Sequence, residues 1–572
     1  MANRDSRATY RQRQAVGPRF AASWGCLMQA SRIVTLRLLV LVIAAIGSGT
    51  VFALESGPGG PLAGTADPLV RRQLETSGRA DVVVTLAEMA DLAPAAALGS
   101  KEARGRFVLA SLQQTAARSQ RELRALLDRR GVSYKPFFIA NSILVRGATP
   151  ALLGEIAARP EVARVDANRQ HAVVDPSSGS ASSGEGRGVE ANLVFVGAPQ
   201  VWSMGITGQG TVIAVHDTGL DEDHPAIRSQ YRGCLNPPSC TVEDHDRNWW
   251  DATGAYPSDP WDGNGHGTFC TGVAVGDDGG ANQIGMAPGA KTIHCKVLTD
   301  GGGTTDADIM ECFQWDLAPW NLAGLDPDPA AAPDIVSISW GYPGGGYGLF
   351  RDAVRALNAA GIVVVALAGS DGPGCATLRS PGDYQEVLTV SGVDHTMPYP
   401  GELTSWSSRG PSTLDPSPPY HFPDVTTPAV NIRSSFPGGV YQGGWSGTGP
   451  ATPHAAGLVA LMWSACPGLR GQVSATLDII HDTAVPLTGQ PGSGCGGDST
   501  VGPNTDWGHG TIDAVSAVQA ALDWCDGVVF RDGFESGDST AWSSTVIVRF
   551  TTPRAAQLHV ESREAAGRPA LG

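Results

Sequence analysis

Asp217 and His266 are the residues whose types and surroundings best suit proton-transfer chemistry. Asp217 ends an apolar run in VIAVHDTGLDEDHP, and His266 stands between two glycines in GNGHGTFCTG, just before a stretch that favours a helix. An imidazole that hydrogen-bonds a carboxylate keeps one tautomer and can take a proton from a nucleophile. A lone Asp at a strand end is more often a turn former or a helix cap, but a core histidine needs no flanking glycines. Together the motifs predict His266 as a general base that Asp217 orients.

A third motif, GTGPATPHAAG at residues 447–457, resembles the serine-bearing motif GTSMAxPHVAG of the subtilisin-like peptidases, or subtilases. The chain order Asp, His and then this motif is that of subtilases and differs from the order in chymotrypsin-like and α/β-hydrolase enzymes. TGQGTVIAVHDTG, NQIGMAPGAK, DIVSISWG and LTSWSSRGPS extend the resemblance over nearly all of residues 193–522. The resemblance implies an α/β fold, a parallel sheet with helices on both faces, in a peptidase domain at residues 192–522. The alternation of Val- and Ile-rich strands with helical stretches agrees with this fold class.

The catalytic motifs depart from the family pattern at the atoms that perform the reaction. Gly449 stands at the nucleophile position, followed by Pro450, and VALAGSDG places Ser370 where the family has an Asn that donates to the oxyanion. In subtilisin itself, loss of the nucleophile costs about 10⁶ in turnover, and loss of this donor costs about 10²–10³. Pro450 suits the first turn of a helix, where no backbone donor is needed. The sequence therefore predicts a fold that survives with absent or severely impaired proteolysis.

Two alternatives remain open from the sequence. The chain could be an active serine endopeptidase in which another group replaces the missing nucleophile, although the hydroxyls of Ser446 and Thr448 are expected to point away from His266, and Cys270 is expected to lie beneath its ring. It could also be a structural module whose function resides in its tail. Self-cleavage of the purified chain would separate the active enzyme from the other readings.

The parts of the peptide-binding cleft that the resemblance implies are present. Ser339, Trp340 and Gly341 would form one wall of the primary specificity pocket. The edge around Gly301, Gly302 and Gly303, which follows Asp300, would let an extended polypeptide add to it as a β-strand. The expected ligand or substrate is therefore a polypeptide, and no cofactor is required.

The segments that flank the peptidase region suggest an exported precursor. Residues 1–53 read as a signal peptide around the apolar stretch Leu38–Ile46, and Met28 would begin a signal of more usual length. Residues 80–175 show a β-α-β-β-α-β pattern, which predicts a small ferredoxin-like α+β domain resembling the inhibitor-type propeptide of subtilases. A flexible linker follows at residues 176–191, and a tail at 523–572. The chain's own propeptide is thus an expected partner, and the expected location is extracellular.

Composition and charge narrow the other partners. The formal net charge of −16 speaks against nucleic-acid binding, and the apolar stretch is too short for a stable membrane span. Ten cysteines in an exported chain predict disulfides, with Cys234 and Cys240 close enough to pair and Cys270 as the expected free thiol. A structural calcium ion is compatible with Asp532, Glu535 and Asp538, although a plain turn is the simpler reading. The sequence does not otherwise identify a metal site.

Overall fold

The computed structural model describes residues 67–172, 188–415, 423–490, 494–496 and 501–527, together with the backbone of strands β19 (Val546–Val548) and β20 (Val560–Ser562). These residues all belong to one compact unit, Gly59–Gly572. The predicted signal peptide at 1–53, most of the linker at 176–191 and most of the tail at 523–572 lie outside the described residues. So do the three acidic residues considered for calcium.

The centre of the fold is an eight-stranded sheet in the order β15-β14-β13-β12-β7-β10-β8, with β16 paired to β14. All its pairings are parallel except that of β14 with β15. The central strands β12 and β13 are completely buried, as expected for a parallel sheet between two helical layers. The strands are β7 (Val212–Asp217), β8 (Trp249–Asp251), β10 (Lys291–Lys296), β12 (Ile335–Ile338), β13 (Val363–Leu367), β14 (Leu388–Asp394), β15 (Glu402–Leu403) and β16 (Val425–Pro428).

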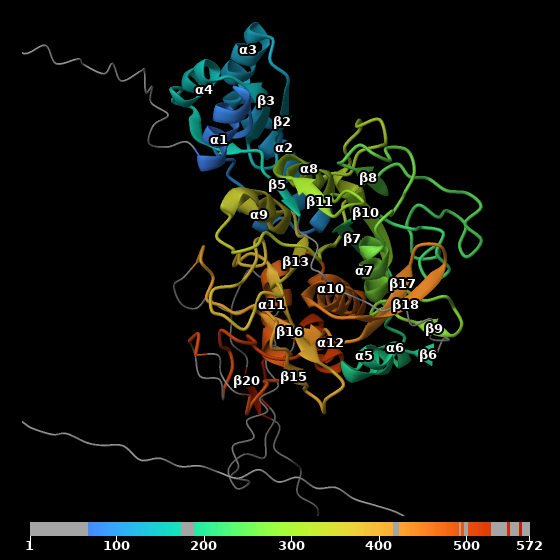
Figure 1. Ribbon diagram of the computed structural model, residues 1–572. Coiled ribbons are helices and arrows are strands. Elements are labelled where there is room, and N and C mark those ends of the chain that lie inside the picture. The colour runs from blue at the N-terminus through green and yellow to red at the C-terminus, as the bar shows by residue number, and fades with distance from the viewer. Residues whose placement is uncertain are drawn as a thin grey trace, which may run out of the picture. The chain divides into compact units, whose positions relative to one another are not determined.

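Helices cover both faces of this sheet (Figure 1). Along β7, Ala214 packs into the core beneath α8 and α9, whereas Ile213 and Val215 pack into the core beneath α7, α10 and α12. The predicted fold class is therefore confirmed. The helices are α5 (Ala191–Phe195), α6 (Ala198–Ser203), α7 (His266–Val275), α8 (Asp306–Leu317), α9 (Arg351–Ala359), α10 (Thr448–Ala465), α11 (Val473–Thr483) and α12 (Ala514–Cys525).

The N-terminal part contains an antiparallel sheet in the order β2-β3-β1-β4, which is the ferredoxin-like order. The predicted pattern has one helix between its first two strands, but the structure has two, because the chain turns at Gln120, whose buried side-chain amide donates to the backbone oxygen of Phe137. The elements are α1 (Pro68–Ser77), β1 (Ala80–Leu86), α2 (Lys101–Ser119), α3 (Arg121–Arg130), β2 (Tyr134–Phe137), β3 (Ser142–Ala148), α4 (Pro150–Ala157) and β4 (Val162–Ala167).

Shorter strands and disulfides complete the described structure. The predicted Cys234–Cys240 bridge is confirmed, and Cys270 is a buried free thiol as expected. Among the described residues the other disulfides are Cys295–Cys312, Cys375–Cys495 and Cys466–Cys525. The short strands are β5 (Gln170–Ala172), β6 (Gly188–Val189), β9 (Asn282–Gln283), β11 (Gly303–Thr305), β17 (Ile432–Phe436) and β18 (Val440–Trp445).

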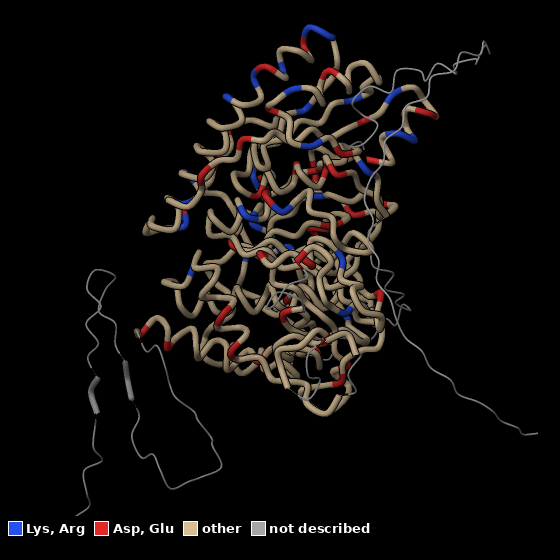
Figure 2. The backbone as a smooth tube through the Cα atoms, turned by 90° about the vertical axis from the view of Figure 1, so that its left-hand side faces the viewer, with Lys and Arg blue, Asp and Glu red and all other residues tan. Residues whose placement is uncertain are grey.

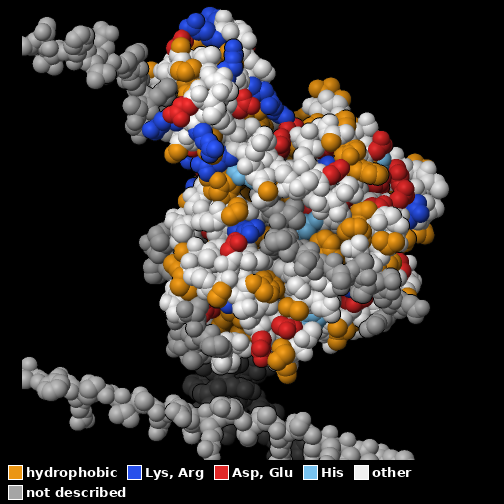
Figure 3. All heavy atoms as spheres, viewed as in Figure 1, with side chains coloured by type: hydrophobic (Ala, Val, Ile, Leu, Met, Phe, Trp, Pro, Cys, Tyr) orange, Lys and Arg blue, Asp and Glu red, His pale blue; other side chains and the backbone are white. Residues whose placement is uncertain are grey.

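Charge is unevenly distributed along the described chain. Between residues 67 and 172 Lys and Arg outnumber Asp and Glu, although the chain as a whole is acidic. The basic side chains are concentrated in this N-terminal part (Figures 2 and 3). No helix within the described ranges is both long and apolar enough to cross a membrane.

Candidate active site

The buried pair of Asp217 and His266 lies where β7 ends and α7 begins. Nδ1 of His266 is 2.7 Å from Oδ1 of Asp217, and both side chains are fully buried. Neighbouring polar groups fix the two elements to each other. The hydroxyl of Thr218 donates to Asp262 at 2.8 Å and accepts from the backbone N–H of Gly267 at 2.9 Å. The carboxylate therefore meets the first residue of the helix in a fixed orientation.

The glycines on either side of His266 are required by packing. A Cβ on Gly265, which has a φ of 97°, would lie 2.2 Å from the ring of Phe436. A Cβ on Gly267 would lie 2.2 Å from the backbone oxygen of Gly219. Both distances are impossible for non-bonded atoms, so only glycine lets α7 begin this close to its neighbours. The sequence correctly marked these glycines as unusual, and the structure shows why they are needed.

The protonation states of the pair follow from their mutual charge. Burial alone would lower the pKa of His266, but the Asp217 carboxylate outweighs it and holds this pKa well above its ordinary value. Burial likewise opposes ionisation of Asp217, yet the charge of His266 and its hydrogen bond lower the pKa of that carboxyl. The geometry is that of a carboxylate orienting an imidazole ring.

Cys270 lies beneath the ring, as expected. Its Sγ is 3.7 Å from Nδ1 and 3.9 Å from Nε2 of His266, and burial raises the pKa of its thiol. A neutral buried thiol is not an activated nucleophile. The ligating atoms of Asp217, His266 and Cys270 come within 4.8 Å of one another, but Nδ1 and Oδ1 are already joined by their own hydrogen bond. This group therefore fits an orienting pair better than a metal site.

Gly449, at the second position of α10, faces Nε2, the imidazole nitrogen that does not contact Asp217. A Cβ built on Gly449 would lie 3.3 Å from Nε2 of His266 and 3.2 Å from the backbone oxygen of Ser339. A side chain at this position would thus point at the general base, as a nucleophile must. Pro450, the next residue, lies in the first turn of the helix, where its missing N–H leaves no hydrogen bond unmade.

The nearby hydroxyls are engaged away from the histidine. Oγ1 of Thr448 accepts from the backbone N–H of Gly369 at 3.2 Å and lies 3.3 Å from Oγ of Ser370. Oγ of Ser446 accepts from the backbone N–H of Asn431 at 3.0 Å. Ser370 thus lies beside the first turn of α10, next to the position of the missing nucleophile. None of these contacts involves His266.

The predicted cleft edge is paired with a strand from the N-terminal part. Strand β5 (Gln170–Ala172) pairs antiparallel with β11 (Gly303–Thr305). Of the three predicted glycines, Gly303 joins this ladder. Gly302, with a φ of 75°, and Gly301 form the turn that precedes it. An extended segment therefore lies along the edge at which the sequence predicted that a polypeptide would bind.

One side chain of this segment, that of His171, is held by a carboxylate and by aromatic rings of the peptidase region. Nε2 of His171 lies 2.8 Å from Oδ1 of Asp306, and its ring packs edge-on against Tyr342 with centroids 4.5 Å apart. The phenol of Tyr347 donates to the same carboxylate at 2.7 Å. The guanidinium of Arg169 lies over the ring of Tyr347, and its backbone N–H also donates to Asp306. The surroundings of His171 are thus an acidic group within an aromatic wall.

Comparisons with known proteins agree with this geometry. The family model described as "Subtilase family" matches residues 208–510, which is more than half of the chain. This chain belongs to the subtilase family. Bacillopeptidase F of Bacillus subtilis (strain 168) is 36% identical over 452 residues, covering 74% of this chain and 30% of that protein.

Shorter subtilases from the same organism match over a smaller region. Serine protease AprX is 32% identical over 288 residues, covering 46% of this chain and 59% of its own length. Subtilisin E is 30% identical over 272 residues, covering 47% of this chain and 60% of its own length. The aligned part of this subtilase therefore covers 30–60% of the length of these three relatives.

The predicted pocket wall Ser339–Gly341 packs against an arginine that the sequence did not single out. A Cβ on Gly341 would lie 2.7 Å from Cβ of Arg379, and one on Gly369 would lie 2.8 Å from Cγ of the same side chain. The guanidinium forms an ion pair with Asp371 at 2.6 Å. The arginine stem therefore fills the space between these two glycine segments in this subtilase.

The N-terminal part makes a second contact with the peptidase region through the first turn of α2. Nζ of Lys101 lies 3.3 Å from the buried carboxylate of Asp334, which Arg470 also pairs with at 2.6 Å. The guanidinium of Arg104, almost fully buried, donates to the backbone oxygen of Gly471. Apolar side chains of the N-terminal part and of the peptidase region also form one continuous core. The contact is thus built as an interior rather than as a loose surface.

Sequence reasoning missed several of these residues for one reason. Asp306 pairs with a residue 135 positions earlier, and Lys101 with one more than two hundred positions later. One local signal was available for the first. Thr305 and Asp308 form a capping box at the start of α8, which places Asp306 in the first turn beside the predicted cleft edge.

Proposed function

We propose that this subtilase binds extended polypeptide in its cleft without effective hydrolysis. Gly449 carries the proposal, because the position that faces Nε2 of His266 has no side chain and hence no nucleophile. Ser370 supplies no amide at the expected oxyanion position.

We infer the ligand class from the segment that pairs with β11 at the predicted cleft edge. Main-chain pairing with β11 accepts any extended sequence, whereas the carboxylate of Asp306 favours a ligand with a basic or imidazole side chain. The ladder register sets His171 opposite Thr304, with Arg169 two residues before it on the same side of the strand. The proposed ligand is therefore an extended polypeptide with basic residues at alternate positions.

The N-terminal part is proposed as the first such ligand. Its basic side chains complement the acidic chain as a whole, and its strand β5 fills the edge that another polypeptide would need. We therefore infer that it acts as an inhibitor-type propeptide of an exported protein and remains linked unless another protease cuts residues 173–187. The inference that the protein is exported depends on the apolar stretch Leu38–Ile46.

A test of both parts uses the full chain from a protease-poor host. Without inhibitors, the chain should stay uncut between Ala172 and Glu190 and should not react with a fluorophosphonate probe, as N-terminal sequencing and gel fluorescence would show. A new N-terminus in this interval that disappears in a Ser446→Ala variant would refute the inactive reading. It would favour the second candidate, an active endopeptidase, whose support is the intact Asp217–His266 hydrogen bond.

Binding is tested after cutting an inserted protease site in the linker. A synthetic peptide with the sequence of residues 167–174 should compete with the N-terminal part for the cleft, and His171→Ala in that peptide should weaken it by roughly 10- to 100-fold, the loss of a hydrogen bond to a charged group. Gln170→Ala is the matched control, because this side chain is exposed on the neighbouring position of the same strand. Equal affinity of the two variants would contradict the role of Asp306.

A further inference from the structure

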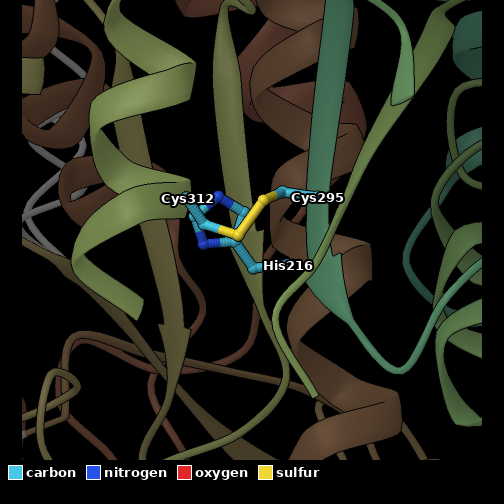
Figure 4. Close-up of side chains that lie close together, drawn as sticks. All are labelled: His216, Cys295 and Cys312. Atoms are coloured by element: carbon cyan, nitrogen blue, oxygen red, sulfur yellow. A yellow bond between two sulfur atoms is a disulfide. The ribbon is translucent and has the colours of Figure 1, made fainter. Parts of the chain in front are cut away.

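Four potential metal ligands converge beneath the strand that carries Asp217. His216 on β7 and Cys295 on β10 are opposite each other in the parallel ladder, so their side chains lie next to each other on one face of the sheet. Cys312 and Asp316 are one turn apart on α8, which covers that face. Figure 4 shows the imidazole of His216 against the Cys295–Cys312 disulfide. The ligating atoms of His216 and the two cysteines all lie within 4.8 Å of one another.

The disulfide alone does not account for the two polar members of this group. His216 and Asp316 are both fully buried, and Nε2 of His216 lies 2.6 Å from Oδ2 of Asp316. This contact pairs the imidazole with the carboxylate, but Nδ1 of His216 and Oδ1 of Asp316 have no hydrogen-bond partner among the described residues. Buried polar groups in native proteins are almost always paired, and an apolar pair of similar volume would cost less. The pair therefore calls for a ligand.

We propose that His216, Cys295, Cys312 and Asp316 bind a zinc ion whenever the two cysteines are reduced. The two thiolates and the imidazole lie within 4.8 Å of one another, and the carboxylate of Asp316 beside the imidazole would complete a tetrahedral zinc site. The zinc ion would satisfy the second imidazole nitrogen and the second carboxylate oxygen, which have no hydrogen-bond partner among the described residues. The site is separate from the cleft and does not depend on the function proposed above.

The exchange between the two states is balanced. A dithiol reductant gives two electrons and two protons to the disulfide, which leaves the thiols of Cys295 and Cys312 and the oxidised reductant. The zinc ion then displaces one proton from each thiol into solvent. Either state fastens α8 to the sheet directly behind Asp217, and α8 begins with Asp306 of the cleft. Disulfide and zinc would thus be alternative means of holding the same helix in place.

The test refolds the full chain from urea under a dithiol reductant, with and without zinc chloride. Zinc should allow the reduced chain to regain its native circular dichroism and to keep about one zinc ion per chain after desalting. Cobalt in place of zinc should give the thiolate-to-metal charge-transfer band and the visible spectrum of a tetrahedral site. A reduced chain that folds no better with zinc than without it, or that keeps no zinc once folded, would overturn the proposal.

Paired variants locate the site. Replacing both Cys295 and Cys312 by Ser should abolish zinc retention, whereas replacing both Cys466 and Cys525, which form another disulfide, should leave it unchanged. Asp316→Asn, a change of similar volume, should lower zinc affinity by about tenfold or more. Zinc retained by the first double variant at the level of the second would show that the metal binds elsewhere and would refute the assignment.

Discussion

Restoring a hydroxyl at position 449 should restore hydrolysis, because the structure already directs this position at the base. A Cβ there lies 3.3 Å from Nε2 of His266 and 3.2 Å from the backbone oxygen of Ser339, which is closer than ordinary contact. The neighbours must therefore move by a few tenths of an ångström, a shift within reach of an imidazole ring. A serine Oγ, one bond beyond that Cβ, then reaches hydrogen-bonding distance of Nε2.

The expected magnitudes follow from the two missing groups. In subtilisin, removal of the nucleophile costs about 10⁶ in turnover, and removal of one oxyanion donor costs about 10²–10³. Gly449→Ser should therefore restore turnover, but at a rate about 10²–10³ below that of a complete catalytic site, because Ser370 does not supply the oxyanion donor. Adding Ser370→Asn should recover much of that deficit. Ser370→Asn alone should recover nothing measurable, since losses within one catalytic unit are not additive.

Hydrolysis of a chromogenic peptide, labelling by a fluorophosphonate and self-cleavage between Ala172 and Glu190 provide three independent readouts. Gly449→Ala is the matched control, because it adds the same Cβ without the hydroxyl and so separates steric from chemical effects. The reasoning is refuted if a folded double variant, Gly449→Ser with Ser370→Asn, neither reacts nor cuts. It is refuted equally if the unmodified chain is as active as Gly449→Ser.

Two further predictions concern acid stability and the second contact. Burial lowers the pKa of His294 and of His454 to about 3. Between about pH 6.5 and pH 3 each of these histidines binds more protons in the unfolded chain than in the folded chain. The free energy of unfolding therefore decreases as the pH falls, by about 1.4 kcal/mol per pH unit for each histidine. His294→Leu should reduce this slope by that amount in urea unfolding followed from about pH 6 to pH 4, and an unchanged slope would contradict it. After the linker is cut, Arg104→Ala should speed release of the N-terminal part by roughly 10- to 100-fold, because it removes a buried hydrogen bond. Arg106→Ala, at an exposed position of the same helix, should leave the release rate unchanged. Gel filtration and surface binding kinetics measure these rates, and equal rates for the two variants would show that the buried contact contributes no binding energy.

The elements that repeat a strong local pattern could be predicted from the sequence. Runs such as IVSI and VVVAL read as buried parallel strands and are β12 and β13. The glycines on either side of His266 indicated a place where the backbone lies too close to its neighbours for any side chain. The break at Gln120 was missed, because the apolar spacing continues through it and the turn depends on a tertiary contact with Phe137.

In the candidate site, too, the residues in local motifs could be predicted, whereas those placed by distant contacts could not. Asp217, His266 and Gly449 stand in motifs whose local sequence is distinctive, so the sequence singled them out and the structure brings them together. Arg379 carries no motif of its own. It matters only because two glycine segments, at 341 and 369, lie against it after folding. Such contacts depend on the packing of distant segments, which spacing along the chain does not encode.

The persistence of Asp217 and His266 is explained without catalysis. Two fully buried ionisable groups stabilise each other, and removing one partner from such a pair typically costs about 3–5 kcal/mol, because the other is left charged and unpaired. The pair also fixes the end of β7 to the start of α7, so its loss would disturb the fold. An intact pair therefore does not distinguish an active subtilase from a binding protein. The deciding observation is the group opposite Nε2, and in this chain that group is the hydrogen of Gly449.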